Sequence, residues 1–144
     1  MSRKEEMQIL NEVYKNADMA ASSLKTIMPK LYDEEFAAEI GAQMEEFKNF
    51  SAKAEKSIRG RGGKPKGTSK VVNAMTWMGI QRKTALDVST SHMADMVIQG
   101  NTKGITEMMK KVHQNKAAGH FANELAKELM DMEEKNIDKI KKYL

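Results

Sequence analysis

The sequence predicts an all-α protein folded as an antiparallel four-helix bundle. Four long segments repeat apolar residues every three or four positions, which is the spacing of one helix face. The chain has only two prolines, Pro29 and Pro65, and both fall between these segments. One connection near the middle of the chain is long, whereas the first is short enough to make its helices antiparallel neighbours.

Composition indicates a single domain and excludes the sites that depend on cysteine. A chain of 144 residues suits one helical-bundle domain spanning 1–144, and its 13 methionines predict a soft, methionine-rich core. The absence of cysteine excludes disulfides, thiolate nucleophiles and Cys-ligated zinc or iron–sulfur sites. The start, MSRKEEMQIL, lacks the apolar core of a signal peptide, so we expect a cytoplasmic protein with no membrane contact.

The first helix is predicted from about Arg3 to Met28. Ser2 is placed to cap it, with Glu5 as the reciprocal partner of a capping box, and Pro29 ends it. The residues on its apolar seam are Met7, Leu10, Tyr14, Ala17, Ala21, Leu24 and Met28.

The second helix is predicted to begin after Asp33, a favourable cap followed by two acidic residues in the first turn. Its seam is formed by Ile40, Met44, Phe47, Ser51, Ala54 and Ile58. Glu39 and Glu46 lie beside this seam, two turns apart on one face, and are therefore candidates for a metal site.

A basic linker, RGRGGKPKG at 59–67, follows the second helix. Six basic and no acidic residues occur between Lys56 and Lys70, so this loop accounts for the net charge of +4. Arg59, Arg61, Lys64 and Lys66 are candidates for binding an anion or nucleic acid. The alternative is a solvated connector, which we favour because the loop lacks aromatic residues and phosphate-loop spacing. We therefore do not expect nucleic acid as a partner.

The third helix is predicted from about Lys70 to Gln99, capped by Thr68 or Ser69. Apolar residues occur on nearly every side of it, which indicates either a central helix or one shared with a second subunit. A four-helix bundle has no central helix, so we expect a homodimer interface containing Trp77 and Ile80. The alternative places Trp77 inside the monomer.

The fourth helical region is predicted over 101–142, after a break at Gly100. The pattern weakens at 113–117, so this region is either one kinked helix or two. The seam of its last part contains Phe121, Leu125, Leu129, Met132, Asn136 and Ile140.

Several stretches resemble small bacterial proteins of ferritin-like bundle type that have no assigned activity. These stretches are HMADMVIQGNTKGI at 92–105 and EEKNIDKIKKYL at 133–144, with NEVYKNADMA near the start and KPKG before the third helix. The resemblance implies a ferritin-like helical bundle that self-associates. It provides no catalytic residue.

A standard ferritin-like di-metal site is excluded by the histidines. That site needs Glu-x-x-His on two helices, because this spacing puts carboxylate and imidazole on one face. His92, His113 and His120 are instead preceded at that distance by Ser89, Lys110 and Ala117. We therefore expect no cofactor.

A non-standard carboxylate and histidine site for iron, manganese or zinc is the alternative. It would use Glu39, Glu46, His120 and Glu124, since the last two lie four residues apart on one face. Otherwise these residues are solvated flanks of the helices.

Two further residues call for an interpretation. His92 is either a ligand, base or pH-sensitive interface group, or a hydrogen-bonded residue of the core or interface. Arg82 falls within an apolar seam and would need a carboxylate partner if buried.

With no nucleophile arrangement and no cofactor fingerprint, the sequence favours a non-enzymatic, self-associating structural or binding protein.

Overall fold

The computed structural model describes residues 2–144, and five α-helices occupy most of them. Within residues 2–144 there is no β-strand, so the prediction of an all-α protein is confirmed. Short 3-10 turns follow the first and last helices, at Met28–Lys30 (η1) and Lys141–Tyr143 (η2). The helices are α1 (Arg3–Ile27), α2 (Glu34–Gly60), α3 (Lys70–Thr84), α4 (Thr90–Gln114) and α5 (His120–Ile140).

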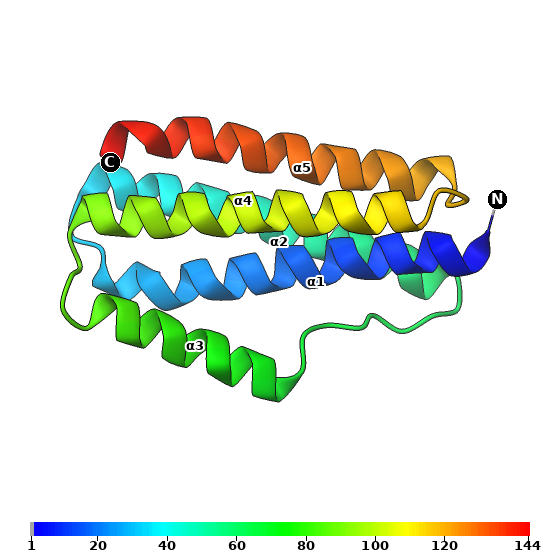
Figure 1. The fold of residues 1–144 in the computed structure, drawn as a ribbon, viewed down its shortest axis with the longest axis horizontal. Helices are drawn as coiled ribbons and strands as arrows, with labels where there is room; N and C mark the ends of the chain where they lie inside the picture. Colours follow the sequence, from blue (N-terminus) through cyan, green and yellow to red (C-terminus); the bar gives the residue numbers. More distant parts are fainter. Residues whose placement is uncertain (1) are drawn as a thin grey trace.

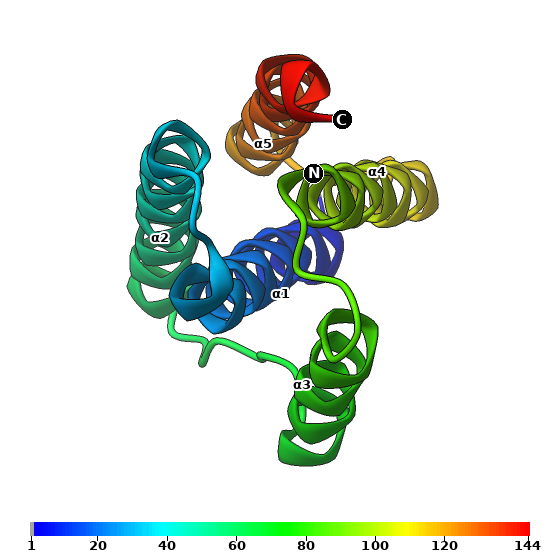
Figure 2. The same cartoon turned by 90° about the vertical axis from the view of Figure 1, so that its left-hand side faces the viewer.

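Four of the helices lie side by side along the long axis of the molecule, and α3 lies outside them against α1 (Figures 1 and 2). The buried apolar residues form one cluster with members from α1, α2, α4 and α5. α3 contributes no fully buried apolar residue, and Thr84 is its only buried one. The core is therefore built by the four long helices, while α3 is an addition to its surface.

Contacts between distant residues fix the directions of these helices. Ion pairs join Glu35 to Lys142 at 2.7 Å and Lys53 to Glu128 at 3.8 Å, so α2 and α5 run in opposite directions. The Asn16 side chain donates to the Gly104 carbonyl at 2.9 Å, and Ser2 N–H donates to the Ala117 carbonyl, so α1 and α4 also run in opposite directions. The connection from α2 to α4, residues 61–89, consequently returns along the length of the molecule (Figure 1).

Side-chain caps set the starts of four helices. Ser2 and Asp33 accept hydrogen bonds from the N–H groups of Glu5 and Phe36, as the sequence predicted. Ser69 caps α3, one of the two residues expected to do so, and Ser89 caps α4 by accepting from His92 N–H at 3.3 Å. Each cap satisfies a donor that the first helical turn cannot pair internally.

The third helix does not extend from Lys70 to Gln99, and that prediction is wrong. The chain leaves the helix after Thr84 and starts α4 at Thr90. Asp87 accepts a hydrogen bond from Ser89 N–H at 2.9 Å, a local turn that competes with helix, and Ser89 then caps the next helix.

The break predicted at Gly100 is absent, because α4 continues without interruption through Gly100 and Gly104. Burial of Val97, Asn101 and Met108 along this helix offsets the weak helix propensity of the two glycines. Of the two alternatives left open for 101–142, the structure has two helices, since α4 ends at Gln114 and α5 begins at His120.

None of the helices formed by residues 2–144 combines the length and the apolar character needed to cross a membrane.

Candidate functional site

A groove of about 730 Å³ runs between α1, α3 and α4 and reaches down to α2 and α5. This volume falls within the range of sites that bind small molecules. The large apolar side chains that line it are Met19, Leu24, Ile27, Phe47, Ile80, Met96 and Val97. We refer to this feature below as the groove.

Three buried polar side chains, Glu12, Asn101 and Glu133, also line the groove. Glu133 is 1% exposed and Asn101 is 5% exposed. The Asn101 amide donates to the Val97 carbonyl at 3.0 Å, but its Oδ1 has no hydrogen-bond partner among residues 2–144, and neither has Glu133 Oε1. Buried acceptors without partners are uncommon in proteins, because each costs free energy when it is removed from water.

Gly104 provides the space that the Glu133 carboxyl group occupies. A Cβ atom at Gly104 would overlap Glu133 Oε2 and would lie 3.1 Å from Asn16 Oδ1. The same glycine accepts the hydrogen bond from Asn16 through its carbonyl. α1, α4 and α5 therefore meet closely at this point, with a carboxyl group enclosed between them.

Burial raises the pKa of two acidic residues that line the groove, Glu133 and Glu12. Desolvation raises the pKa of Glu133 to about 8, so this carboxyl group is mostly neutral at pH 7. Burial also raises the pKa of Glu12, and the nearby Lys15 and Lys111 partly oppose that change. Glu12 and Lys15 form an ion pair at 3.7 Å.

Two further buried amides, Gln43 and Asn136, lie in the core near Asn101. Gln43 is 0% exposed and Asn136 is 1% exposed. The proximity of Gly104 to Glu133 in an antiparallel pair puts Asn101 level with Asn136. The ion pairs between α2 and α5 put Gln43 at nearly the same level. The three amides and Glu133, one turn along α5 from Asn136, form a polar layer in the core.

The sequence contains only a partial signal for this layer. Asn136 lies on the buried seam of the last helix, as predicted, whereas the burial of Glu133 was not predicted. Glu133 lies four residues after Leu129 and three before Asn136, and therefore falls on a stripe that is otherwise buried. An acidic residue at such a position is either at the edge of the stripe or buried, and spacing alone does not distinguish these outcomes.

The four residues considered for a metal site are not brought together. His120 and Glu124 are exposed on α5, whereas Glu39 and Glu46 are half-buried on α2. The antiparallel register puts His120 level with the last turn of α2 and Glu39 level with the last turns of α5. His120 and Glu39 are therefore about 30 Å apart along the helix axes. In the part of the chain that the structure describes, no group of three or more His, Asp or Glu residues could hold a metal ion.

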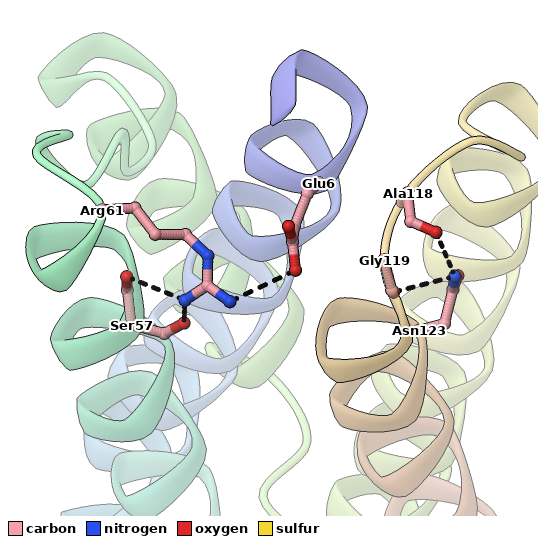
Figure 3. Close-up of polar contacts among 6 residues, drawn as sticks. All are labelled: Glu6, Ser57, Arg61, Ala118, Gly119 and Asn123. Carbon is pink, nitrogen blue, oxygen red and sulfur yellow. Dashed lines mark hydrogen bonds and ion pairs between the residues drawn. The ribbon is translucent and has the colours of Figure 1, made fainter. Parts of the chain in front are cut away.

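The two arginines of the basic linker are engaged within the protein. Arg61 donates to Glu6 at 3.2 Å and to the Ser57 carbonyl at 3.2 Å (Figure 3). Its guanidinium carbon also lies 5.4 Å from the centre of the Phe121 ring. Phe121 is 42% exposed, so its predicted place on the buried seam is wrong. Arg59 pairs with Glu55 at 3.7 Å.

The lysines of the linker, Lys64 and Lys66, have exposed side chains. The Lys66 N–H donates to Asn11 at 2.9 Å, which holds this part of the linker against α1. At the end of the bundle where Arg61 contacts Glu6, the Asn123 side chain donates to the carbonyls of Ala118 and Gly119 and so stabilises the start of α5 (Figure 3). This part of the linker is therefore held against the bundle, while three of the four candidate cations, Arg59, Lys64 and Lys66, have exposed side chains.

The two residues predicted for a dimer interface lie one turn apart on the same side of α3, where both line a small pocket against α1, but they differ in exposure. Trp77 is 53% exposed. Ile80 is half-buried, packs against the core cluster and lines the groove. Thus only Trp77 is well placed to contact another molecule.

His92 and Arg82 have contrasting environments. His92 Nε2 lies 3.0 Å from the Lys83 carbonyl and Nδ1 lies 3.8 Å from Asp87, so the ring bridges the end of α3 and the start of α4. These contacts favour the hydrogen-bonded interpretation of His92. Arg82 is exposed and needs no buried carboxylate.

Comparisons of the chain with protein-family models, with curated proteins and with solved structures each found no match.

Proposed function

We propose that this protein is a non-enzymatic, ferritin-like antiparallel four-helix bundle that self-associates through α3. The fold assignment is supported by the order and directions of the helices. α1 with α2 and α4 with α5 are joined by short turns, and the two pairs are linked by one long crossover at 61–89. A single long crossover is the connectivity of ferritin-like bundles.

The exposed apolar stripe of α3 carries the proposal of self-association. Val71, Met75 and Met78 follow one another at helical spacing and are 70%, 67% and 52% exposed. Trp77, which is 53% exposed, lies on another side of α3, next to Ile80 and against α1. A contiguous exposed apolar stripe of this kind is typical of an interaction site.

A second copy of the chain is the partner that best suits this stripe. No charged residue occurs between Lys70 and Arg82. Two α3 helices that meet in antiparallel orientation would therefore bury an uncharged stripe between them, with Lys70 of one copy and Arg82 of the other beyond its ends. Such a contact is self-complementary, as a two-fold symmetric dimer requires.

The polar groups around the groove support a binding role better than an enzymatic one. Among the described residues, the buried polar groups of the groove are the carboxyl groups of Glu12 and Glu133 and the amide of Asn101, and none of these is a hydroxyl or thiol nucleophile. We therefore assign no reaction to the protein.

The oligomeric state in solution tests this proposal. We expect light scattering coupled to size exclusion to give the mass of a dimer at micromolar concentration, and Met75→Glu to give the 16.2 kDa monomer. Met109→Glu is the matched control, because Met109 is also exposed but lies on α4. A monomeric wild-type protein, or dissociation by both variants alike, would contradict self-association through α3.

A further inference from the structure

We propose that the dimer formed through α3 binds a small multivalent oxyanion of the phosphate type at each end of its interface. Each site would combine Arg82 of one copy with Lys70 of the other, so that neither copy alone contains it. This inference rests on the self-association proposed above, and it adds a ligand that strengthens the dimer. The charges at the ends of the exposed stripe carry it.

Arg82 continues the line of exposed apolar residues on α3. The stripe of Val71, Met75 and Met78 reaches residue 82 after four more positions, which keeps the spacing of one helix face. Ile80, which packs against the core cluster, lies on the opposite side of the helix. Arg82 is exposed, and none of the ion pairs within residues 2–144 includes it. The stripe is therefore followed by a positive charge at the C-terminal end of α3.

An antiparallel pair of α3 helices places this charge beside the start of the other copy. If the helices cross at Met75, in the middle of the stripe, residue 82 of one copy lies level with residue 68 of the other, because both are equally far from the crossing point. Lys70, the first residue of α3, lies next to that level. Two-fold symmetry repeats the arrangement at the other end of the stripe. Two cations from different copies therefore meet at each end of the interface.

The surrounding segment supplies no carboxylate to neutralise these cations. Residues 56–86 contain no acidic residue. The acidic residues on either side of the segment, Glu55 and Asp87, already accept from a neighbouring arginine and from a backbone N–H. Lys70 is exposed and, like Arg82, is absent from the ion pairs within residues 2–144. Because like charges repel, each end of the interface opposes association until an anion binds there.

The chemistry of the two side chains selects the anion. Arginine presents paired N–H donors that match the oxygens of a phosphate group, and lysine adds a compact positive charge. A monovalent anion such as chloride compensates only one of the two cations. Pyrophosphate carries enough charge for both, and its two phosphate groups can contact one cation each. We therefore take pyrophosphate as the probe and chloride as its comparison.

The dissociation constant of the dimer, measured with and without pyrophosphate, tests the proposal. Sedimentation velocity over a range of protein concentrations gives this constant in a low-salt buffer, with either millimolar pyrophosphate or sodium chloride at equal ionic strength. We expect pyrophosphate to strengthen the dimer about tenfold more than chloride does. Two equivalent sites give roughly this factor when the concentration of the anion is about twice its Kd.

Lys70→Gln and Arg82→Gln each remove one cation from both sites. Two effects of opposite sign are expected in each variant. Without pyrophosphate the variant should dimerise more tightly than the wild type, because repulsion is relieved, and pyrophosphate should strengthen it less. A general loss of helix stability would not produce this combination. Lys110→Gln is the matched control, because Lys110 is also exposed but lies on α4.

Three results would overturn the proposal. Equal strengthening by pyrophosphate and chloride would exclude the anion sites while leaving the dimer intact, and so would equal effects in Lys70→Gln and Lys110→Gln. A wild-type protein that is monomeric in both buffers would contradict self-association through α3, and this inference with it. Circular dichroism of each variant shows whether the helical fold is retained, and Arg82→Gln gives a separate answer if Lys70→Gln alters the fold.

Discussion

The Glu133 side chain combines near-complete burial with an oxygen that has no hydrogen-bond partner in the part of the chain that the structure describes. Its pKa is raised by desolvation from an ordinary 4.5 to about 8. Between about pH 4.5 and pH 8, Glu133 in the folded protein therefore keeps a proton that the same residue has lost in the unfolded chain. The free energy of unfolding therefore decreases as pH rises through this range, by about 1.4 kcal/mol per pH unit from this group.

Replacing Glu133 with Gln should remove that pH dependence. The expected outcome is a free energy of unfolding that rises relative to that of the wild type between about pH 5 and about pH 8, by roughly 4 kcal/mol over this range. Urea unfolding at several pH values measures it, and the comparison with wild type cancels the contribution of Glu12. Glu134→Gln should show no such trend. A difference between Glu133→Gln and wild type that stays constant with pH would disprove the assignment.

Within α4, the two glycines four residues apart have opposite roles. A Cβ at Gly100 would meet nothing within 4 Å, so Gly100→Ala should stabilise the protein by about 1 kcal/mol through better helix propensity. A Cβ at Gly104 would overlap the Glu133 carboxyl group, so Gly104→Ala should be destabilising. Thermal or urea unfolding of both variants gives the comparison.

A double-mutant cycle identifies the cause of the Gly104 effect. In a Glu133→Ala background the obstructing carboxyl group is gone, and Gly104→Ala should then be neutral or stabilising. If Gly104→Ala costs the same in both backgrounds, the clash with Glu133 is not the reason for the glycine.

Individual helices were predicted best where a side-chain cap, an apolar seam and a clear end signal all indicated the same boundaries. α1 and α2 combine a side-chain cap, an apolar seam and a clear end, and both were predicted closely. The division between α3 and α4 was missed because Leu86 and Val88 continue the apolar pattern, although both are exposed in the structure. The turn at Asp87 and Ser89 decides that boundary, and its signal is only two residues long.

For the molecule as a whole, the helical class could be read from periodicity but the site could not. The groove depends on the position of α3 beside α1 and α4, and α3 carries almost no amphipathic signal that would place it. The polar layer depends on the register between helices, which joins Gln43, Asn101 and Asn136 from three separate segments. Spacing within one helix contains no information about this alignment.

The position of α3 leads to a prediction about how the molecule opens. The four long helices share one core, whereas α3 packs on α1 and adds no fully buried apolar residue to that core. Its backbone hydrogen bonds should therefore open more easily, because little apolar burial is lost when they do. We expect hydrogen exchange at low protein concentration to be fastest, among the five helices, in Lys70–Thr84.

Self-association through the exposed stripe adds a dependence on concentration to this exchange. As the protein dimerises, α3 becomes covered and its exchange should slow, while exchange in the middle of α1 should change little. Met75→Glu should retain fast exchange in α3 at every concentration, and Met109→Glu should behave like wild type. Exchange in α3 as slow as in α1 in the dilute Met75→Glu variant would show that α3 belongs to the cooperative core. In that case its apolar stripe would be the exposed side of a core helix, and only light scattering would then report on a dimer.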